Sequence, residues 1–216
     1  MPNNANSNRN IQLYEIHKKA KKAASIIIKE AGKAGHGLGE YFERQLEHEV
    51  GYLLKKRSTF LYFNYVYPHG GRTDILVEQY PDIGGERSST WIEIKFKKSG
   101  LSNLGWKADF RKLRKVRQGS WQSHHAGYWI WLYIFDNYET EIVKRFGNSN
   151  TWQRIRSVKQ IAAFFIHHNN HRKLGNVLTE ICKACGNVGL CSILPSLPLR
   201  EYSSYSALLI TTQVKR

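Results

Sequence analysis

Two short stretches of this chain carry most of the information about its fold: Gly71-Arg72-Thr73-Asp74-Ile75-Leu76-Val77 and Trp91-Ile92-Glu93-Ile94-Lys95-Phe96. Both are rich in Ile, Val and aromatic residues, which predicts two strands. The connection between them, residues 80–89, is rich in turn-forming residues. Eighteen residues lie between Asp74 and Glu93. If the two strands are neighbours, we expect these carboxylates to lie together.

Alternation along the second strand separates its charged side chains from its apolar ones. Glu93 and Lys95 share one face, while Ile92, Ile94 and Phe96 point to the other, toward a core. Adjacent carboxylates repel each other unless a cation lies between them. Mg²⁺ prefers oxygen ligands, and such an ion can activate water and stabilise charge on a phosphate. Lys95 would add positive charge there or help to orient the attacking water.

Asp74 together with Glu93-Ile94-Lys95 resembles the core motif of the PD-(D/E)xK nuclease superfamily, over roughly residues 36–136. Thr73 stands where the family name has proline. The resemblance implies an α/β, restriction-endonuclease-like fold, with a mixed central sheet flanked by helices. It also implies that Asp74 and Glu93 bind Mg²⁺, for which Mn²⁺ would substitute. The carbonyl of Ile94 would join them, and Lys95 would assist catalysis.

Two further likenesses add candidate residues. The run Gly39-Glu40-Tyr41-Phe42-Glu43-Arg44 is similar to the first helix of archaeal Holliday-junction resolvases, which makes Glu43 a third acid near the metal. An ion pair on a solvated face is the alternative for Glu43, and Glu40 would replace it if the helix register differs. Gln118 is followed by an Ala-Gly step into a predicted strand, and this pattern resembles a Gln-containing helix and the strand after it in several nucleases of the superfamily. Gln118 would orient DNA or water, or it is a surface residue.

The composition points to a polyanionic partner. The chain has 216 residues, 33 Lys and Arg against 17 Asp and Glu, and a formal charge of +16. Its many aromatic residues indicate a folded protein rather than a basic tail. A folded and strongly basic protein most often binds nucleic acid, so we expect DNA as the partner.

A basic run follows the Glu93 strand directly and contains a single acid, Asp109. The run could simply be a solvated face. Because it follows the Glu93 strand directly, however, we expect it to contact phosphates close to the proposed reacting centre. The predicted DNA-binding residues are Lys97, Lys98, Lys107, Arg111, Lys112, Arg114, Lys115 and Arg117.

The apolar spacing predicts the organisation of the rest of the chain. Residues 1–10 are expected to be a flexible tail, 11–35 a basic helix and glycine-rich linker, 36–146 the nuclease core, and 147–216 a mainly helical C-terminal extension. The extension would cover the core, bind DNA or build a dimer face. The predicted helices are 11–31, 39–56, about 106–124 and 151–168, and further strands are predicted at 58–67 and 128–135, with a returning strand within 202–214.

Cysteine content and hydropathy bound the setting of the protein. Three cysteines argue against a disulfide framework, and we expect Cys182, Cys185 and Cys191 to be buried or free thiols rather than zinc ligands. No segment approaches the roughly 20 apolar residues of a membrane span. The polar N-terminus lacks the pattern of a secretory signal. An intracellular protein is therefore expected.

These observations favour a Mg²⁺-dependent DNA endonuclease that hydrolyses phosphodiester bonds with metal-activated water. One alternative is a structure-selective junction resolvase of the same fold, acting as a homodimer, because paired sites related by two-fold symmetry suit a four-way junction. The alternative from a different class is a nucleic-acid-binding protein whose acids are structural.

Overall fold

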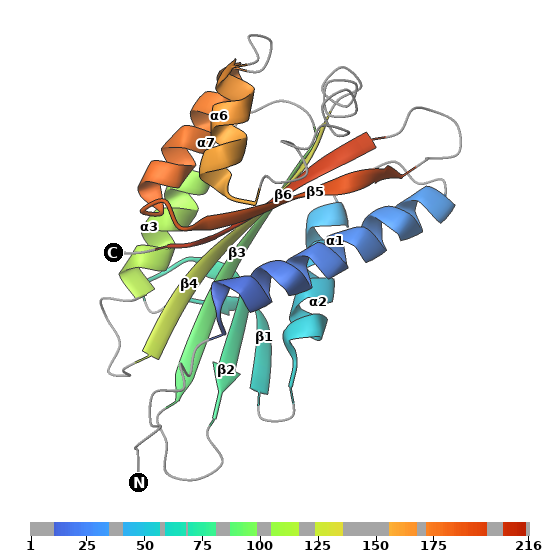
Figure 1. The fold of residues 1–216 in the computed structure, drawn as a ribbon. Helices are drawn as coiled ribbons and strands as arrows, with labels where there is room; N and C mark the ends of the chain where they lie inside the picture. The colour runs from blue at the N-terminus through green and yellow to red at the C-terminus, as the bar shows by residue number, and fades with distance from the viewer. Residues whose placement is uncertain are drawn as a thin grey trace, which may run out of the picture.

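The computed structural model describes residues 11–34, 41–56, 59–67, 69–80, 87–98, 105–116, 124–135, 156–167, 172–197 and 205–214. In these ranges five helices accompany a sheet of six strands in the order β1-β2-β3-β4-β6-β5 (Figure 1). The predicted flexible tail, residues 1–10, lies outside them, as do Arg117 and Gln118. The α/β class with a mixed sheet, predicted from the sequence, is confirmed.

The elements follow one another along the chain as α1 (Leu13–Ala34), α2 (Tyr41–Leu54), β1 (Thr59–Val66), β2 (Arg72–Gln79), β3 (Ser88–Lys98), α3 (Trp106–Val116), β4 (His124–Ile134), α6 (Val158–His167), α7 (Arg172–Ala184), β5 (Gly189–Leu197) and β6 (Tyr205–Gln213). Strands β1, β2 and β3 form an antiparallel meander. Strand β4 runs parallel to β3, after the crossover through α3. Strand β6 is antiparallel to both β4 and β5.

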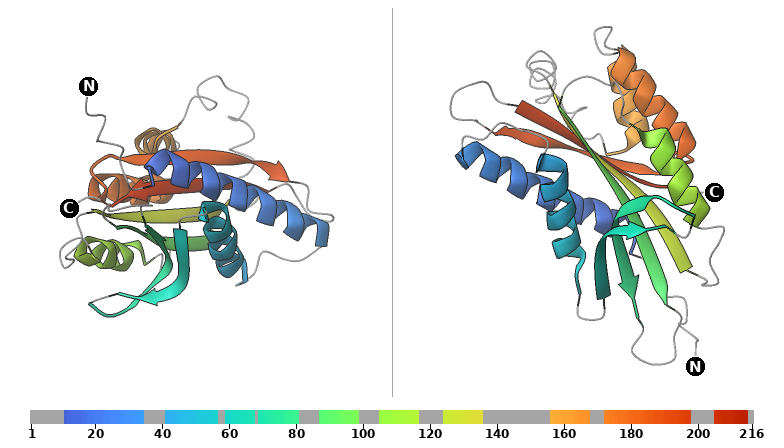
Figure 2. Two further views of the ribbon diagram at one scale, coloured as in Figure 1. Left: turned by 90° about the horizontal axis from the view of Figure 1, so that it is seen from below. Right: turned by 180° about the vertical axis from the view of Figure 1, so that it is seen from behind.

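The core lies on both faces of the sheet, because alternate residues of each strand point in opposite directions. On β4, Tyr128, Ile130 and Leu132 pack in one cluster with α1 and α2, whereas Trp129 and Trp131 pack in the other with α3, α6 and α7. Figure 2 shows the two groups of helices around the twisted sheet. Burial on both faces explains why β4 is an almost unbroken apolar run.

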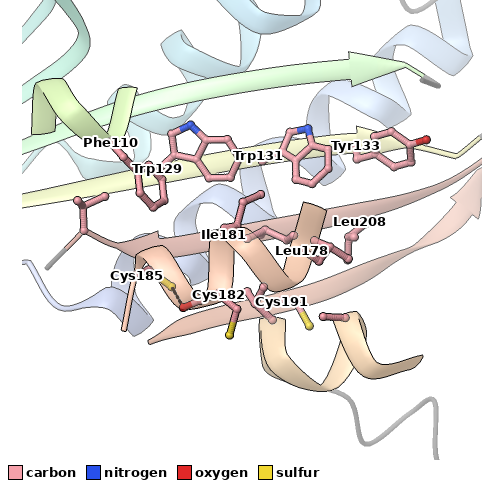
Figure 3. Close-up of a cluster of buried hydrophobic side chains, with 14 of the residues drawn as sticks. Phe110, Trp129, Trp131, Tyr133, Leu178, Ile181, Cys182, Cys185, Cys191 and Leu208 are labelled. Carbon is pink, nitrogen blue, oxygen red and sulfur yellow. Dashed lines mark hydrogen bonds between the residues drawn. The ribbon is translucent and has the colours of Figure 1, made fainter. Parts of the chain in front are cut away.

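The cluster on the α3 side holds large aromatic side chains and all three cysteines (Figure 3). Cys182, Cys185 and Cys191 are buried and form no disulfide bond, and their burial was predicted. Burial raises the pKa of Cys185 to about 11 and that of Cys191 to about 12, so both thiols stay protonated near neutral pH. The C-terminal region therefore supplies packing for the sheet as well as the strands β5 and β6.

The structure confirms most predicted elements and corrects two boundaries. The predicted helix to residue 124 is wrong at its end, because α3 ends at Val116 and His124 already pairs with Ser88 as part of β4. The predicted helix 151–168 begins only at Val158. Ser157 and Gln160 form a reciprocal capping box there, in which the Gln160 N–H donates to Ser157 Oγ at 3.3 Å and the Ser157 N–H donates to Gln160 Oε1 at 3.1 Å.

The returning strand predicted within 202–214 is confirmed as β6. Strand β5 was not predicted. Among the helices that the structure describes, none has the length and hydrophobicity needed to cross a membrane.

Candidate active site

The candidate site lies where strands β2 and β3 separate. Their ladder ends at the pair Ile75–Ile92, and Asp74 and Glu93 follow directly beyond it, so the predicted adjacency of the two strands is confirmed. Side chains take over the bonding at this point: Thr73 Oγ1 donates to the carbonyl of Ile92 at 2.9 Å. The N–H of Ile94 donates to Asp74 Oδ2 at 2.5 Å. We call this opening between the two strands the fork.

Strand β1 is distorted on the other side of Asp74. Asn64 has a φ of 52°, a left-handed value that asparagine tolerates better than most residues. The β1–β2 register is the same on both sides, at Phe63–Ile75 and Tyr65–Thr73, but the intervening Asn64–Asp74 pair is missing from the ladder. Asp74 is therefore placed between two interruptions of regular pairing, which free its side chain for other contacts.

Helix α2 contributes two acids to the fork. Glu43 Oε2 accepts a hydrogen bond of 2.9 Å from the N–H of Phe96, on the stretch of β3 beyond the last β2 pair. Glu47 lies one turn further along α2 and is only 7% exposed. The charges of Asp74 and Glu43 both act on Glu47, which places all three carboxylates in one electrostatic neighbourhood.

Helix α3 contributes an acid from the other face of the sheet. Asp109, the single acid of the basic run, is 3% exposed, and its Oδ2 accepts a hydrogen bond of 3.2 Å from the indole N–H of Trp129. The close packing of α3 on β4 depends on Gly127, where a Cβ atom would lie 3.1 Å from Leu113 Cβ. The fork is thus reached by acids from helices on both sides of the sheet.

Two lysines lie among these acids without close hydrogen bonds. Lys95 Nζ is 3.7 Å from Glu43 Oε1 and 3.8 Å from Asp109 Oδ2. Lys112 Nζ is 3.5 Å from Glu93 Oε2 and 3.5 Å from Asp109 Oδ1. Charge-assisted hydrogen bonds are about 2.7–2.9 Å long, so these are loose ion pairs.

Tyr67 fixes the second acid of the motif. Its hydroxyl donates to Glu93 Oε1 at 2.7 Å. Tyr67 directly follows β1, and the turn after it has positive φ values at Gly70 and Gly71, which glycine adopts without steric cost. The N–H of Tyr67 donates to the carbonyl of Gly71 at 2.9 Å and closes this turn. The Gly-Gly pair therefore sets the position from which Tyr67 reaches Glu93.

The acids of the fork outnumber its lysines. Five carboxyl groups share this neighbourhood with the ammonium groups of Lys95 and Lys112, and they belong to Glu43, Glu47, Asp74, Glu93 and Asp109. Burying like charges together favours the protonated forms, because neither water nor enough counter-charge offsets the repulsion.

The pKa values follow from this crowding. Burial, reinforced by the Asp74 charge, raises the pKa of Glu93 to about 8. Burial likewise raises the pKa of Asp74 to about 6, against the opposing effects of the Ile94 N–H and of Lys95. Burial and the charges of Asp74 and Glu43 raise the pKa of Glu47 to about 7. Without a further cation, the fork therefore retains protons near neutral pH.

The pKa of Lys95 is also raised, but here the raised value favours the charged form. Burial alone would lower its pKa, but the carboxylates of Asp109, Asp74 and Glu43 outweigh burial and raise it. The amine therefore remains an ammonium ion at neutral pH. A permanently charged Lys95 can stabilise negative charge, but it is a poor proton acceptor.

The donor set fits a hard divalent cation. Glu93 Oε2 is buried and has no hydrogen-bond partner among the described residues, with the loose ion pair to Lys112 as its neighbour. The carbonyl of Ile94 faces the same edge of β3 as its N–H, toward Asp74. Within the described ranges, no three Asp, Glu, His or Cys side chains are gathered as a ready-made metal cluster. Mg²⁺ does not require one, since it keeps several waters and uses one or two carboxylates.

The structure divides the basic residues predicted to bind DNA. Arg111 and Lys115 are exposed on α3, and Lys97 is partly buried on β3. Lys107 lies 3.3 Å from Glu180, and Arg114 donates to the carbonyl of Ala184 at 2.8 Å. Lys112 belongs to the fork. The side chain of Lys98, like Arg117 and Gln118, lies outside the described residues.

Sequence reasoning missed three members of the fork. Glu47 could have been found, because it lies four residues after Glu43 on the same helix face. Asp109 carried the weaker signal of a lone acid within a basic run. Nothing in the sequence marks Tyr67, because its role depends on the turn that brings it beside Glu93.

Comparison of the chain with protein-family models, with curated proteins and with solved structures returned no match.

Proposed function

We propose that this protein is a metal-dependent DNA endonuclease of the PD-(D/E)xK type. The observation that carries the proposal is the fork: Asp74 and Glu93 lie side by side where two strands part, with Lys95 on the same strand as Glu93. A structural role alone does not account for several neighbouring acids whose pKa values are raised, first by burial and then by the charges of the other acids.

Asp74 and Glu93 would hold the cation, together with the carbonyl of Ile94, and Glu43 would be a further acid beside it. When bound, a divalent cation acidifies water and offsets the charge that develops on a phosphodiester. Tyr67 positions Glu93 by donating to Oε1, which leaves Oε2 as its free ligand atom. The N–H of Ile94 orients Asp74 in the same way.

Lys95 would act on the phosphate rather than on a proton. Its ammonium group lies among the acids of the fork, and its raised pKa keeps it charged. A fixed positive charge beside the reacting phosphate stabilises the negative charge of the transition state. Release of Lys112 from its loose ion pair with Glu93 would provide a second cation near the substrate.

DNA would reach the fork along the α3 side of the sheet. The exposed Arg111 and Lys115 lie on the helix that also carries Asp109 and Lys112. The formal charge of +16 favours a phosphate backbone as the partner, and its neutralisation makes the affinity fall with salt.

Cleavage of supercoiled plasmid DNA in Mg²⁺ tests the proposal. Asp74→Asn keeps the shape of the side chain and removes its charge, so cleavage should fall by about 10³-fold or more, because several kcal/mol of charge stabilisation is lost. Lys95→Ala should reduce cleavage by about 10²- to 10³-fold and leave metal binding largely intact.

DNA affinity should hold or rise in Asp74→Asn, because a negative charge that faces the phosphates is removed. If Asp74→Asn cuts at a rate close to that of the wild type, the nuclease assignment is wrong. A protein that binds DNA without metal-dependent cleavage would then be the better description.

A further inference from the structure

The α3 face of the sheet has a part that carries exposed aromatic rings. Helices α3, α6 and α7 contribute to the cluster that covers β4 and β6 on this face. At the other end of the sheet lies the edge strand β1 (Figure 1). There Phe60 is 57% exposed, Tyr65 is 41% exposed and Tyr80 is 38% exposed. Tyr62 is partly buried against the cluster. We call Phe60, Tyr62, Tyr65 and Tyr80 the aromatic strip.

Ring contacts connect Tyr62 and Tyr65 of the aromatic strip to the fork, while Phe60 and Tyr80 contact each other with ring centroids 5.1 Å apart. Tyr62 and Tyr65 have ring centroids 5.4 Å apart, and Tyr65 lies 5.9 Å from Trp91. Trp91 stacks on Tyr67 at 5.0 Å with an interplanar angle of 16°, and the Tyr67 hydroxyl binds Glu93. A ligand lying on the strip would therefore be within a few side chains of the proposed reacting centre.

The left-handed residue in β1 helps to build the strip. Regular alternation would place Tyr62 and Tyr65 on opposite faces of the sheet, because they are an odd number of residues apart. Asn64, with its φ of 52°, lies between them, and the two rings are in contact. The same distortion that frees Asp74 thus brings Tyr65 onto the face that carries the fork.

The charges around the strip select the kind of ligand. Arg72 is exposed at the start of β2, and the Arg87 guanidinium lies 4.9 Å from the centre of the Tyr80 ring. Arg87 is also paired with Glu78, which holds it at this position. A second copy of a chain with a charge of +16 would bring the same cations to this face. A polyanion with flat apolar groups complements both features.

We propose that the aromatic strip stacks unpaired nucleobases, so that the substrate is a nucleic acid with a single-stranded segment beside the phosphate at the fork. This inference rests on the proposed nuclease function and adds its substrate class. Stacking on aromatic side chains needs bases whose faces are open, which paired duplex does not offer. Flaps, gapped strands and branched DNA carry such bases next to duplex.

Binding without cleavage tests the strip independently of the chemistry. Fluorescence anisotropy in EDTA would compare a labelled single-stranded oligonucleotide with the duplex of the same sequence. Phe60→Ala and Tyr65→Ala should each weaken single-strand binding by roughly 5- to 100-fold, the range expected for one stacked base, and change duplex binding by less than about twofold. Tyr65→Phe keeps the ring and should bind like the wild type.

Matched controls separate stacking from general effects. Tyr14 and Tyr52 are 69% and 74% exposed on α1 and α2, so Tyr14→Ala and Tyr52→Ala should leave both affinities unchanged. Phe60→Leu and Tyr65→Leu keep apolar bulk without an aromatic face, and they replace the alanine variants if those unfold. An oligonucleotide with abasic sites should bind wild type and Tyr65→Ala equally weakly.

Three results would overturn the proposal. Equal losses on single strand and duplex would assign the rings to folding or to phosphate contacts. Unchanged single-strand binding in the alanine and leucine variants would exclude stacking. A dimeric wild type that becomes monomeric in Tyr65→Ala, measured by light scattering, would assign the strip to a second copy. Wild-type protein that binds single strands in EDTA but cuts no DNA in Mg²⁺ would contradict the nuclease proposal and still support the stacking proposal. The two failures are therefore distinguishable.

Discussion

The fork and the buried His17 lie in different parts of the molecule, and they differ in whether the buried titratable group has a complete set of hydrogen-bond partners. His17 on α1 is 8% exposed; its Nδ1 lies 3.0 Å from Thr211 Oγ1 and its Nε2 lies 2.9 Å from Ser192 Oγ. Both ring nitrogens therefore have neutral partners. Burial, with Lys21 nearby, lowers the pKa of His17 to about 4, so the ring is neutral and needs nothing more.

Glu47, Glu93 and Asp109 of the fork are buried to a similar degree, but their neighbours include further carboxylates. Glu93 keeps one oxygen without a hydrogen bond, and its pKa is raised to about 8. A buried group with complete neutral partners indicates a structural role. A buried group that is left incomplete beside like charges indicates a site for an ion or a substrate. This difference fits a stabilising role for α1 with β5 and β6, and it supports our proposal that the fork is the reacting centre.

The largest expected effect that could break this contrast concerns Glu43. Its carboxylate accepts the Phe96 N–H, so it could be a structural acceptor like the partners of His17. Glu43→Gln keeps an acceptor for that bond and removes the charge. If Glu43 helps to hold the cation, the Mg²⁺ concentration for half-maximal cleavage should rise by roughly 10- to 100-fold.

Glu49→Gln is the matched control for that measurement, because Glu49 lies on the same helix about 120° around from Glu43. It should leave the Mg²⁺ requirement unchanged. If Glu43→Gln has wild-type activity at limiting Mg²⁺, Glu43 serves only as a structural hydrogen-bond acceptor for the Phe96 N–H.

A second prediction concerns which side of the sheet binds DNA, the side covered by α3 or the side covered by α1. Arg111→Ala with Lys115→Ala removes two exposed cations from α3, so the dependence of log K on log salt should become shallower by roughly 2. Lys18→Ala with Lys22→Ala removes the same charge from exposed positions of α1, the helix of His17, and should leave the slope unchanged. Equal changes in both pairs would mean that binding is non-specific over the surface.

The smallest expected effects are in stability, and the two sites predict opposite signs with pH. The folded fork holds carboxyl protons that the unfolded chain loses near pH 4, so its contribution to stability falls as pH rises toward about 8. In the unfolded chain His17 is protonated below about pH 6.5, whereas in the folded protein it stays neutral down to about pH 4. Its contribution to stability therefore falls as pH drops toward about 4.

Thermal unfolding in EDTA between pH 4.5 and 8.5 would check both signs. Asp74→Asn should raise Tm relative to the wild type, more at pH 8.5 than at pH 4.5, by about 1–2 kcal/mol or roughly 2–8 °C. His17→Gln should flatten the acid side of the profile instead. A destabilised Asp74→Asn at high pH would show that the acids of the fork are not in mutual repulsion.

Local sequence predicted that strands β2 and β3 are neighbours and so bring Asp74 and Glu93 together at the candidate site. Asp74, Glu93 and Lys95 could be placed because the period of two and the turn-rich connection act over a few residues. The same local signals predicted the sheet class, α1, α2 and the return of β6.

Contacts between distant segments could not be predicted in this way. Tyr67 and Asp109 join the fork through a turn and through the packing of α3 on β4. Strand β5 contains Gly189 and Pro195, which weaken a strand signal, and it is a strand because β6 pairs with it. The left-handed conformation of Asn64 has only the weak local signal of its residue type, although it shapes both the fork and the aromatic strip.

Binding of Mn²⁺ to the protein alone, followed by the loss of its free-ion electron paramagnetic resonance signal, tests the central claim most directly. The claim is that the crowded acids of the fork are completed by a divalent cation. Wild-type protein should bind Mn²⁺ more tightly as pH rises from 6 toward 8.5, because the ion displaces protons from Asp74 and Glu93. Asp74→Asn should weaken binding at least about tenfold, and His17→Gln should not change it. Equal Mn²⁺ binding by wild type and Asp74→Asn, or none by either, would contradict the account.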